Sequence, residues 1–362
     1  MGNKAGLLRK IPQQWPMPKR PKPIVFIGAG GIVRAAHLPT YRKAGFHNAG
    51  VYDKHLPTAE KTARDFRVPH VFRTLAEAAR VSGVVFDVAV PATGILSVLK
   101  GLPNKAVVLI QKPLGVDLKS AKRILALCRT KKLTAAVNFQ CRFSPNMMVL
   151  RDLLERGALG VLTDAEIRVN LFTPWGQWRF LEGIPRMEIL YHSIHYLDLL
   201  RSLLGEPKDV YCRTYRNPRL SPRYRDAAHS AILNYGPSMR CALYVNHAFV
   251  YGPRHSMVQL KVEGMKGVAI ANMQQKLNSA RDAQGHDWLE VCFEDSKWMK
   301  VPLKGDWFFD AFQGPMANLQ RYASGEDKVL RTRVEDATKT MTLVEALYLS
   351  ARKPGTKIPQ VI

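Results

Sequence analysis

Near the start of the chain stands the stretch Ile24-Val25-Phe26-Ile27-Gly28-Ala29-Gly30-Gly31-Ile32-Val33. Its first four residues are apolar and stop at Gly28, which predicts a buried parallel strand, and a helix is predicted next over residues 32–44. Gly28 permits a tight turn and Gly30 lets the backbone approach a pyrophosphate, while the helix N-terminus supplies unpaired N–H donors. This context favours a dinucleotide-binding turn over a plain glycine turn, with candidate cofactor contacts at Gly28, Ala29, Gly30, Gly31 and Ile32.

The acid that completes such a turn is Asp53. It ends the second predicted strand, residues 48–53, and lies about 20 residues after Val33, as the dinucleotide fingerprint requires. Val33 itself replaces the third glycine of G-x-G-x-x-G, which weakens the motif. An acid at this place accepts hydrogen bonds from the adenosine ribose hydroxyls and repels a 2′-phosphate, so NAD is favoured. Lys54 follows directly and can tolerate that phosphate, so NADP stays an alternative, and both residues are candidate cofactor contacts.

Strand-like and helix-like segments alternate up to residue 139. This alternation predicts an α/β Rossmann-type fold with a doubly wound parallel sheet. Such sheets bind ligands at the carboxyl ends of their strands, so Pro91, Gln111 and Lys112 join the candidate cofactor site. The further predicted strands are 71–72, 84–90, 107–110 and 133–139, and the predicted helices are 58–66, 75–80 and 118–130.

The second half of the chain has a different pattern, in which strands follow one another. It predicts an α+β domain with a large, mostly antiparallel open sheet. We therefore divide the chain into a basic, proline-rich arm (1–23), a dinucleotide-binding domain (24–142) and a substrate-binding and oligomerisation domain (143–362). The arm is expected to be extended or mobile and solvated. The predicted strands are 161–172, 210–215, 230–234, 241–247, 257–263, 267–271, 288–292 and 297–301, and the predicted helices are 147–156, 190–204, 308–324 and 334–351.

Composition excludes several classes of protein. The chain has 362 residues, 46% of them hydrophobic, so the bulk of it is not disordered, and it lacks the apolar window of about 18 residues that a membrane span needs. The net charge is +25, but no nucleic-acid-binding motif accompanies it, and residues 1–142 carry 25 Lys and Arg against 6 Asp and Glu. Five widely spaced cysteines predict reduced thiols, and no signal peptide is recognised, so a cytoplasmic location is expected.

Several motifs along the chain share the pattern of one enzyme family. Besides the glycine turn they are His37-Leu38-Pro39, Gln111-Lys112-Pro113-Leu114-Gly115, Arg142-Phe143-Ser144-Pro145, Gly157-Ala158-Leu159-Gly160, His195-Tyr196-Leu197-Asp198-Leu199 and Glu345-Ala346-Leu347-Tyr348-Leu349-Ser350. With them, residues 24–362 resemble the Gfo/Idh/MocA family of NAD(P)-dependent oxidoreductases. The resemblance implies an enzyme that removes hydride from a CH–OH group of a sugar, sugar acid or cyclitol, and it names no single substrate.

The resemblance also assigns catalytic roles to Lys112 and His195. The family motif Glu-Lys-Pro matches Gln111, Lys112 and Pro113, and its proline is often cis, which would aim the lysine. The lysine is expected to bind the reacting hydroxyl and the nicotinamide ribose, where a cation assists hydride loss. His195 matches the family's general acid/base, and an imidazole suits proton transfer near neutral pH. The alternatives are a solvated loop lysine and a satisfied core histidine.

Two family carboxylates are missing. The glutamate of the second motif is Gln111, and Tyr191 stands four residues before His195, where the family has aspartate. Fewer negative charges reduce repulsion toward an anionic substrate, which Arg142, Arg179 or Arg186 can pair with if the fold brings them near. A sugar acid is therefore one expected substrate, and ordinary drift in a family that handles neutral polyols is the alternative.

The remaining candidate pocket residues are Tyr191, His192, Arg142 and Asp198. Trp175 either stacks on a sugar ring or belongs to the core. Glu188, His192 and His195 share one helical face, but their spacing is no recognised metal signature and hydride transfer needs no metal, so none is expected.

Three functions remain open at this point. The first is an NAD(P)-dependent dehydrogenase for a carbohydrate-like substrate, and the second is an enzyme with tightly bound NAD that uses transient oxidation for isomerisation, elimination or glycosidic cleavage. The third is a non-catalytic, ligand-sensing regulator. We expect a homodimer or homotetramer, because a half-exposed apolar sheet needs cover, and neither nucleic acid nor membrane as a partner.

Overall fold

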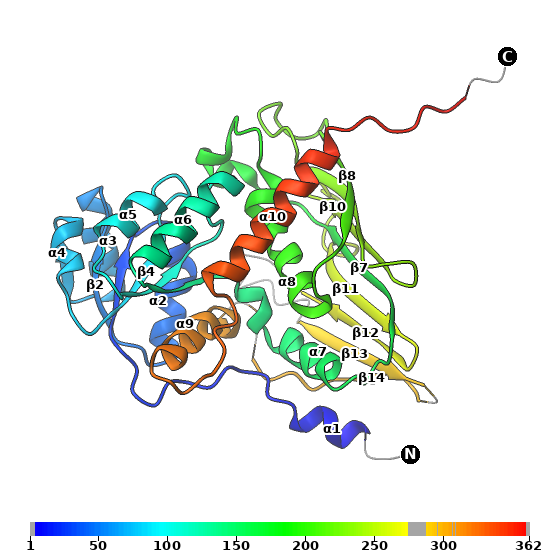
Figure 1. Ribbon diagram of the computed structural model, residues 1–362, viewed down its shortest axis with the longest axis horizontal. Helices are drawn as coiled ribbons and strands as arrows, with labels where there is room; N and C mark the ends of the chain where they lie inside the picture. The colour runs from blue at the N-terminus through cyan, green and yellow to red at the C-terminus, as the bar shows by residue number, and fades with distance from the viewer. Residues whose placement is uncertain (1–3, 274–286, 295, 306, 308, 360–362) are drawn as a thin grey trace.

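The computed structural model describes residues 4–273, 287–294, 296–305, 307 and 309–359. It has two parts: an α/β domain at the left of Figure 1 and a large sheet at the right, with helices α7, α8 and α10 between them. Both parts have the predicted fold class.

The first sheet has six parallel strands in the order β3-β2-β1-β4-β5-β6. Its central strands β1 and β4 are buried on both faces, as their apolar runs predict. The sequence of strands reverses direction between β1 and β4, and the carboxyl ends of these strands form one edge. The strands are β1 (Ile24–Ile27), β2 (Asn48–Tyr52), β3 (His70–Phe72), β4 (Val85–Val88), β5 (Val107–Ile110) and β6 (Thr134–Val137).

The crossover helices agree with the sequence pattern except in three details. The helix predicted over 32–44 contains a π-helical turn, η1 (Val33–His37), before α2 (Leu38–Lys43), and α3 (Leu56–Phe66) begins two residues before the predicted start at Thr58. Helix α5 (Ile95–Gly101) was not predicted. Asp117 caps α6 (Leu118–Thr130) through a capping box with Ser120. The remaining crossover helix is α4 (Leu75–Ala79).

The second sheet has eight strands in the order β14-β13-β12-β11-β7-β10-β9-β8. All neighbours are antiparallel except β7 and β10, and alternate residues face the helices. The strands are β7 (Leu162–Asn170), β8 (Asp209–Tyr215), β9 (Ala228–Asn234), β10 (Arg240–Asn246), β11 (Met257–Gly264), β12 (Gly267–Asn272), β13 (Trp288–Phe293) and β14 (Met299–Lys300).

Helices cover one face of this sheet, and Figure 1 shows the other face bare. Helix α10 packs against α6, α8 and β8 and so links the two parts, while α9 packs against β5, β6 and α2 of the first domain. No helix in the described part of the chain is long and apolar enough to cross a membrane. All five cysteines are free. The helices are α7 (Pro145–Glu155), α8 (Ile194–Leu204), α9 (Phe309–Ala323) and α10 (Val334–Ala351), with short turns η2 (Gln140–Phe143), η3 (Trp175–Gln177), η4 (Arg179–Leu181) and η5 (Ile189–Ser193).

The N-terminal segment is packed rather than solvated, contrary to the expectation from its composition. It begins with a short helix, α1 (Lys4–Lys10), and Leu8 and Ile11 are buried in the main core. The Trp15 ring lies edge-on to Phe143, and its indole N–H donates to Asp327 at 2.8 Å. A few apolar side chains spaced among the prolines thus hold the segment against the fold.

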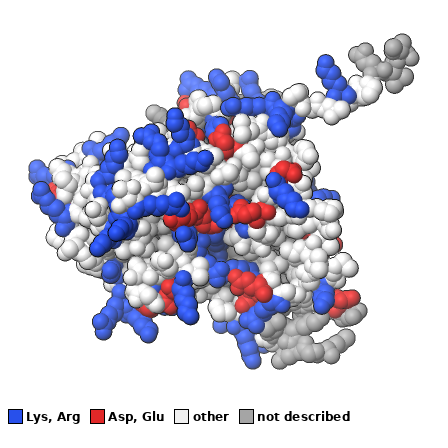
Figure 2. Space-filling model, viewed as in Figure 1, with Lys and Arg blue, Asp and Glu red and all other residues white. Residues whose placement is uncertain are grey.

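Positively charged side chains are spread over the face that Figure 2 shows. Figure 2 shows Lys and Arg side chains across the α/β domain at the left, with few acidic side chains there.

Candidate active site

The glycine turn lies between β1 and the first crossover helix. Gly28 has φ +108°, and a Cβ atom there would lie 2.3 Å from the carbonyl oxygen of Ala89, so only glycine fits. Gly30 and Gly31 are exposed, and a Cβ atom on either would meet nothing within 4 Å. The backbone beside Ile32 therefore borders open space at the start of a helix, which fits the pyrophosphate of a dinucleotide.

Asp53 holds this turn. Its Oδ2 accepts a hydrogen bond from the backbone N–H of Ala29 at 2.9 Å, and its Oδ1 accepts one from the N–H of His55 at 2.9 Å. A carboxylate has further acceptor sites, so it can also accept from ribose hydroxyls. Lys54 is exposed beside it.

The ends of three strands lie side by side. The N–H of Ala89 donates to the carbonyl of Ile27, and the N–H of Gln111 donates to that of Val88, both at 2.9 Å. Pro91 is exposed just beyond β4. The structure thus places Gly28, Pro91 and Lys112 at the carboxyl ends of β1, β4 and β5, around the point where the strand order reverses.

Gln111 has a structural partner that explains an amide at this position. Its Nε2 lies 3.2 Å from Nε2 of His37, whose Nδ1 lies 2.8 Å from an oxygen of the buried Asp87. Because a carboxylate only accepts, His37 donates to Asp87 from Nδ1 and accepts at Nε2 from Gln111 and from Asn138, 3.1 Å away. A glutamate at position 111 would place a carboxylate oxygen, which only accepts, against Nε2 of His37, which is also an acceptor.

Lys112 is half-buried and held at both ends. Its backbone N–H donates to Oε1 of Gln111 at 2.7 Å, and its Nζ donates to the carbonyl of Tyr191 at 2.5 Å. The Lys112–Pro113 peptide bond is cis, as the resemblance predicted. Burial lowers the pKa of Lys112 to about 8, so the amine is mostly protonated at neutral pH.

His195 lies about one helical turn after Tyr191 and is 6% exposed. Its Nδ1 has no hydrogen-bond partner, and its ring meets Phe139 edge-on at 6.4 Å. Burial lowers the pKa of His195 well below its ordinary value, and the nearby charges of Lys112 and His192 add to this. The imidazole is therefore neutral and able to accept a proton.

Tyr191 and His192 adjoin these two residues. The Tyr191 ring is half-buried against Phe180, with ring centroids 5.8 Å apart. The His192 side chain is 19% exposed, and burial followed by the neighbouring His247 lowers its pKa to about 4. Tyr191 contacts Lys112 through its backbone carbonyl, and His192 follows directly.

Arg142 and Asp198 are committed to each other. Two nitrogens of the Arg142 guanidinium donate to the two Asp198 oxygens at 2.6 and 2.5 Å, and one of them also donates to Asp336. Burial lowers the pKa of Arg142, but Asp198 and Asp336 outweigh it and hold the pKa above its ordinary value. This arrangement favours a structural role for the pair over the substrate contact expected from sequence.

Comparison with known proteins agrees with the resemblance. A family model described as "Oxidoreductase family, NAD-binding Rossmann fold" matches residues 22–139, and one described as "Oxidoreductase family, C-terminal alpha/beta domain" matches residues 151–359. The chain belongs to the Gfo/Idh/MocA oxidoreductase family. YceM of Salmonella typhimurium, named as an oxidoreductase, is 34% identical over 137 residues, or 37% of this chain and 44% of that protein. The match thus spans less than half of that relative.

Two other Gfo/Idh/MocA proteins match over most of their length. D-apiose dehydrogenase of Paraburkholderia graminis is 23% identical over 352 residues, or 91% of this chain and 88% of that protein. The crystal structure of an Agrobacterium radiobacter oxidoreductase, in complex with NAD+, L-tartaric acid and magnesium, superimposes with a TM-score of 0.75 at 18% identity. It covers 92% of this chain and 96% of that one, and at such identity it shows the fold alone.

The tryptophan and arginines considered from sequence are occupied elsewhere in this Gfo/Idh/MocA chain. Trp175 is 4% exposed and its ring packs edge-on to His247 at 5.0 Å and to Trp178 at 6.2 Å, which favours its core role over sugar stacking. Arg186 forms two hydrogen bonds with Glu345, at 2.6 and 2.7 Å. The side chain of Arg179 lies outside the described residues.

Sequence analysis missed a cluster around Glu188. This fully buried carboxylate faces His192, His229 and His247. Burial raises the pKa of Glu188, but the electrostatic effect of His229 and the hydrogen bonds of the three histidines outweigh burial and hold that pKa well below its usual range. The sequence did contain a signal for this cluster: His229 and His247 occupy positions at which the alternation of β9 and β10 points side chains into the protein. A histidine at such a position needs a polar partner.

Proposed function

We propose that this protein is an NAD-dependent dehydrogenase that oxidises a secondary hydroxyl of a sugar, sugar acid or cyclitol. The observation that carries the proposal is that Lys112 stands at the same carboxyl edge of the sheet as the glycine turn, and that its charge lies close enough to the buried His195 to lower the pKa of that imidazole. One Lys112 hydrogen goes to the carbonyl of Tyr191, which leaves two for the substrate oxygen.

The roles of the two residues follow from their charge states. A bound nicotinamide supplies the hydride acceptor. Lys112 donates a hydrogen bond to the reacting hydroxyl and stabilises the negative charge that grows on its oxygen. The His195 imidazole accepts the hydroxyl proton, so that the carbon loses hydride and the oxygen ends as a carbonyl.

The substrate class rests on relatives and on a neighbouring cavity. One relative is named as a D-apiose dehydrogenase, which supports a carbohydrate. A cavity of about 830 Å³ is lined by Tyr191 and by Lys119, Lys122 and Arg123 of α6, and the acids Asp117 and Glu345 also line it. Since Arg142 and Arg186 are already paired, these three cations are the stronger support for an acidic or extended sugar.

A screen of sugars, sugar acids and cyclitols with NAD and NADP tests the proposal. We expect reduced nicotinamide to accumulate in proportion to substrate consumed, with NAD preferred. Product formed without net reduced nicotinamide would instead indicate a bound cofactor that is oxidised and reduced within each turnover. The absence of any turnover and of any cofactor binding would contradict both.

Cofactor preference is expected to depend on Asp53. Asp53→Asn keeps an acceptor for the N–H of Ala29 but removes the negative charge. Because a hydrogen bond to a charged group contributes about 1.5–3 kcal/mol, we expect KM for NAD to rise roughly tenfold or more, while KM for NADP falls. Glu60→Gln, an exposed acid on α3, is the control and should leave both values unchanged. An unchanged NAD to NADP ratio in Asp53→Asn would contradict the assignment.

The pH dependence of oxidation is expected to show one ionisation near neutrality. Lys112 is protonated below its pKa of about 8, so kcat/KM should fall as pH rises through 8. His195 is already neutral above the ordinary histidine pKa of about 6.5, so no fall is expected between pH 8 and 6.5. Lys112→Arg keeps its charge at high pH and should lose the alkaline fall. The same fall in the arginine variant would assign it to another group.

We also propose that a second copy of the chain covers the bare sheet face. Tyr211, Ile232 and Tyr244 stand exposed on the adjacent strands β8, β9 and β10. A group of exposed apolar side chains on one face usually marks an interface between protein chains. A monomeric mass in light scattering at micromolar concentration would contradict this.

A further inference from the structure

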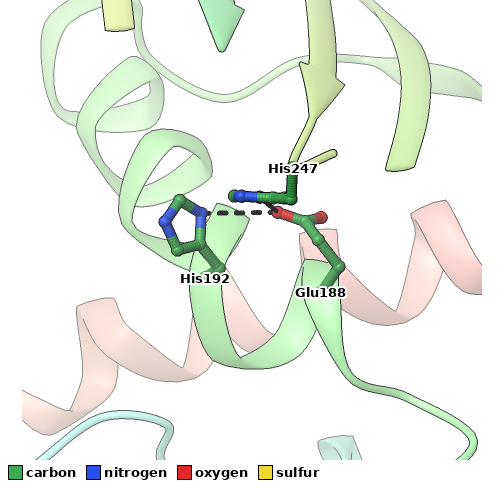
Figure 3. A group of neighbouring side chains, drawn as sticks. All are labelled: Glu188, His192 and His247. Atoms are coloured by element: carbon green, nitrogen blue, oxygen red, sulfur yellow. Dashed lines mark hydrogen bonds and ion pairs between the residues drawn. The ribbon is translucent and has the colours of Figure 1, made fainter. Parts of the chain in front are cut away.

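The cluster around Glu188 has the composition of a metal site. Figure 3 shows that the Glu188 carboxylate and the rings of His192 and His247 converge, although His247 follows β10, 59 residues further along the chain. Oε1 of Glu188 lies 3.0 Å from Nε2 of His247 and 3.4 Å from Nδ1 of His192. One ligand atom from each of the three residues lies within 4.8 Å of the other two.

These separations match what one ion requires. Zn²⁺ binds histidine nitrogen and carboxylate oxygen at about 2.0–2.2 Å, so two ligands of a tetrahedral ion lie about 3.3 Å apart. Both measured separations from Glu188 are close to that value. Two histidines and one glutamate also form a ligand set in which zinc keeps its fourth position open.

Two outer residues orient the ligands. Oγ1 of Thr173 lies 2.7 Å from Nδ1 of His247, so the other ring nitrogen of that histidine is aimed at Glu188. Nδ1 of His229, which is 1% exposed, lies 2.8 Å from Oε2 of Glu188. Metal-binding histidines and carboxylates usually have such partners on the side away from the ion.

Hydrogen bonds alone leave some buried nitrogen atoms of this cluster without a partner. Ser193 and His247 donate to Oε1 of Glu188, but Nδ1 of His192 and Nε2 of His229 are buried without a hydrogen-bond partner. Buried polar atoms without partners are costly, and a metal ion would engage the His192 nitrogen directly.

We propose that Glu188, His192 and His247 bind one divalent transition-metal ion of the zinc type. The sequence analysis considered Glu188, His192 and His195 as a possible ligand set and expected no metal. In the set proposed here, His247 takes the place of His195. These three ligands leave the fourth position of the ion open, and His192, the partly exposed ligand, directly follows Tyr191, whose carbonyl accepts from Lys112. A water molecule or an oxygen of the substrate takes that position.

Metal binding is tested on the full, untagged chain without substrate or nicotinamide, so that its failure leaves the dehydrogenase proposal intact. The protein is stripped with a chelator, dialysed and titrated with Zn²⁺ by calorimetry, and metal content is measured after dialysis. We expect one ion per chain. In the intact chain, Co²⁺ should give the intense visible absorption of a tetrahedral site.

Variants show whether this cluster holds the ion. Glu188→Gln and His247→Ala should weaken Zn²⁺ binding by more than the roughly 10–100-fold expected for Thr173→Val, which removes an outer partner. His255→Ala, an exposed histidine elsewhere in the same domain, is the matched control and should bind as the wild type does. The proposal would be overturned if the wild type bound less than one Zn²⁺ per chain or gave no tetrahedral Co²⁺ spectrum. It would also be overturned if Glu188→Gln bound Zn²⁺ with wild-type affinity.

Discussion

Lys112→Met is expected to lower kcat about 100- to 1000-fold, the usual effect of removing one donor that stabilises charge in a transition state. The methionine keeps most of the length of the side chain but has no proton to donate to the substrate oxygen or to the carbonyl of Tyr191. The loss should appear in kcat rather than only in KM, because the charge on the oxygen grows as hydride leaves. Steady-state rates with saturating NAD measure it.

Two controls separate chemistry from folding. Lys339→Met removes an exposed lysine of α10, 63% exposed, and should leave kcat unchanged. Thermal unfolding of Lys112→Met should stay close to that of the wild type, because replacing a lysine whose burial lowers its pKa removes a desolvation cost. A variant with normal kcat would show that Lys112 is a structural lysine, and the regulator hypothesis would then gain support.

The parts of the site near one another in sequence were predictable. The strand, the glycine turn and Asp53 follow from patterns of a few residues, since the turn requires glycine at Gly28 and the acid follows the next strand. The same holds for Lys112, because an apolar strand followed by Gln-Lys-Pro ends at the binding edge of the sheet. The family resemblance added the chemical roles, which no local pattern contains.

The partners of these residues were not predictable, because they come from distant segments. Whether Gln111 weakens or suits the site depends on His37, 74 residues earlier. His247, which contacts Glu188, lies 59 residues after it along the chain. The N-terminal segment shows the same limit. Its charge and prolines indicate an open tail, but Gln13 and Trp15 form hydrogen bonds with Pro302 and Asp327, about 300 residues later.

Asp198→Asn is expected to lower the free energy of unfolding by about 3–5 kcal/mol, since it leaves the buried Arg142 charge with one partner fewer. The Arg142 and Asp198 side chains are 7% and 1% exposed, and the second acid, Asp336, is 28% exposed and shared with Arg201. Urea denaturation measures the change. The control is Asp152→Asn, which breaks the exposed pair with Arg156 and should cost less than about 1 kcal/mol.

The same variant separates the two roles considered for this pair. If Asp198 only anchors Arg142, then KM for the substrate should change little at a temperature where the variant is folded. If Asp198 binds substrate, KM should rise while the free energy of unfolding stays near that of the wild type. The geometry favours the first result, because both Asp198 oxygens accept from Arg142 and one accepts from Thr340 as well. A carboxylate so fully engaged has little capacity left for a sugar hydroxyl, and the pair instead ties η2 of the dinucleotide side to α8, the helix that carries His195.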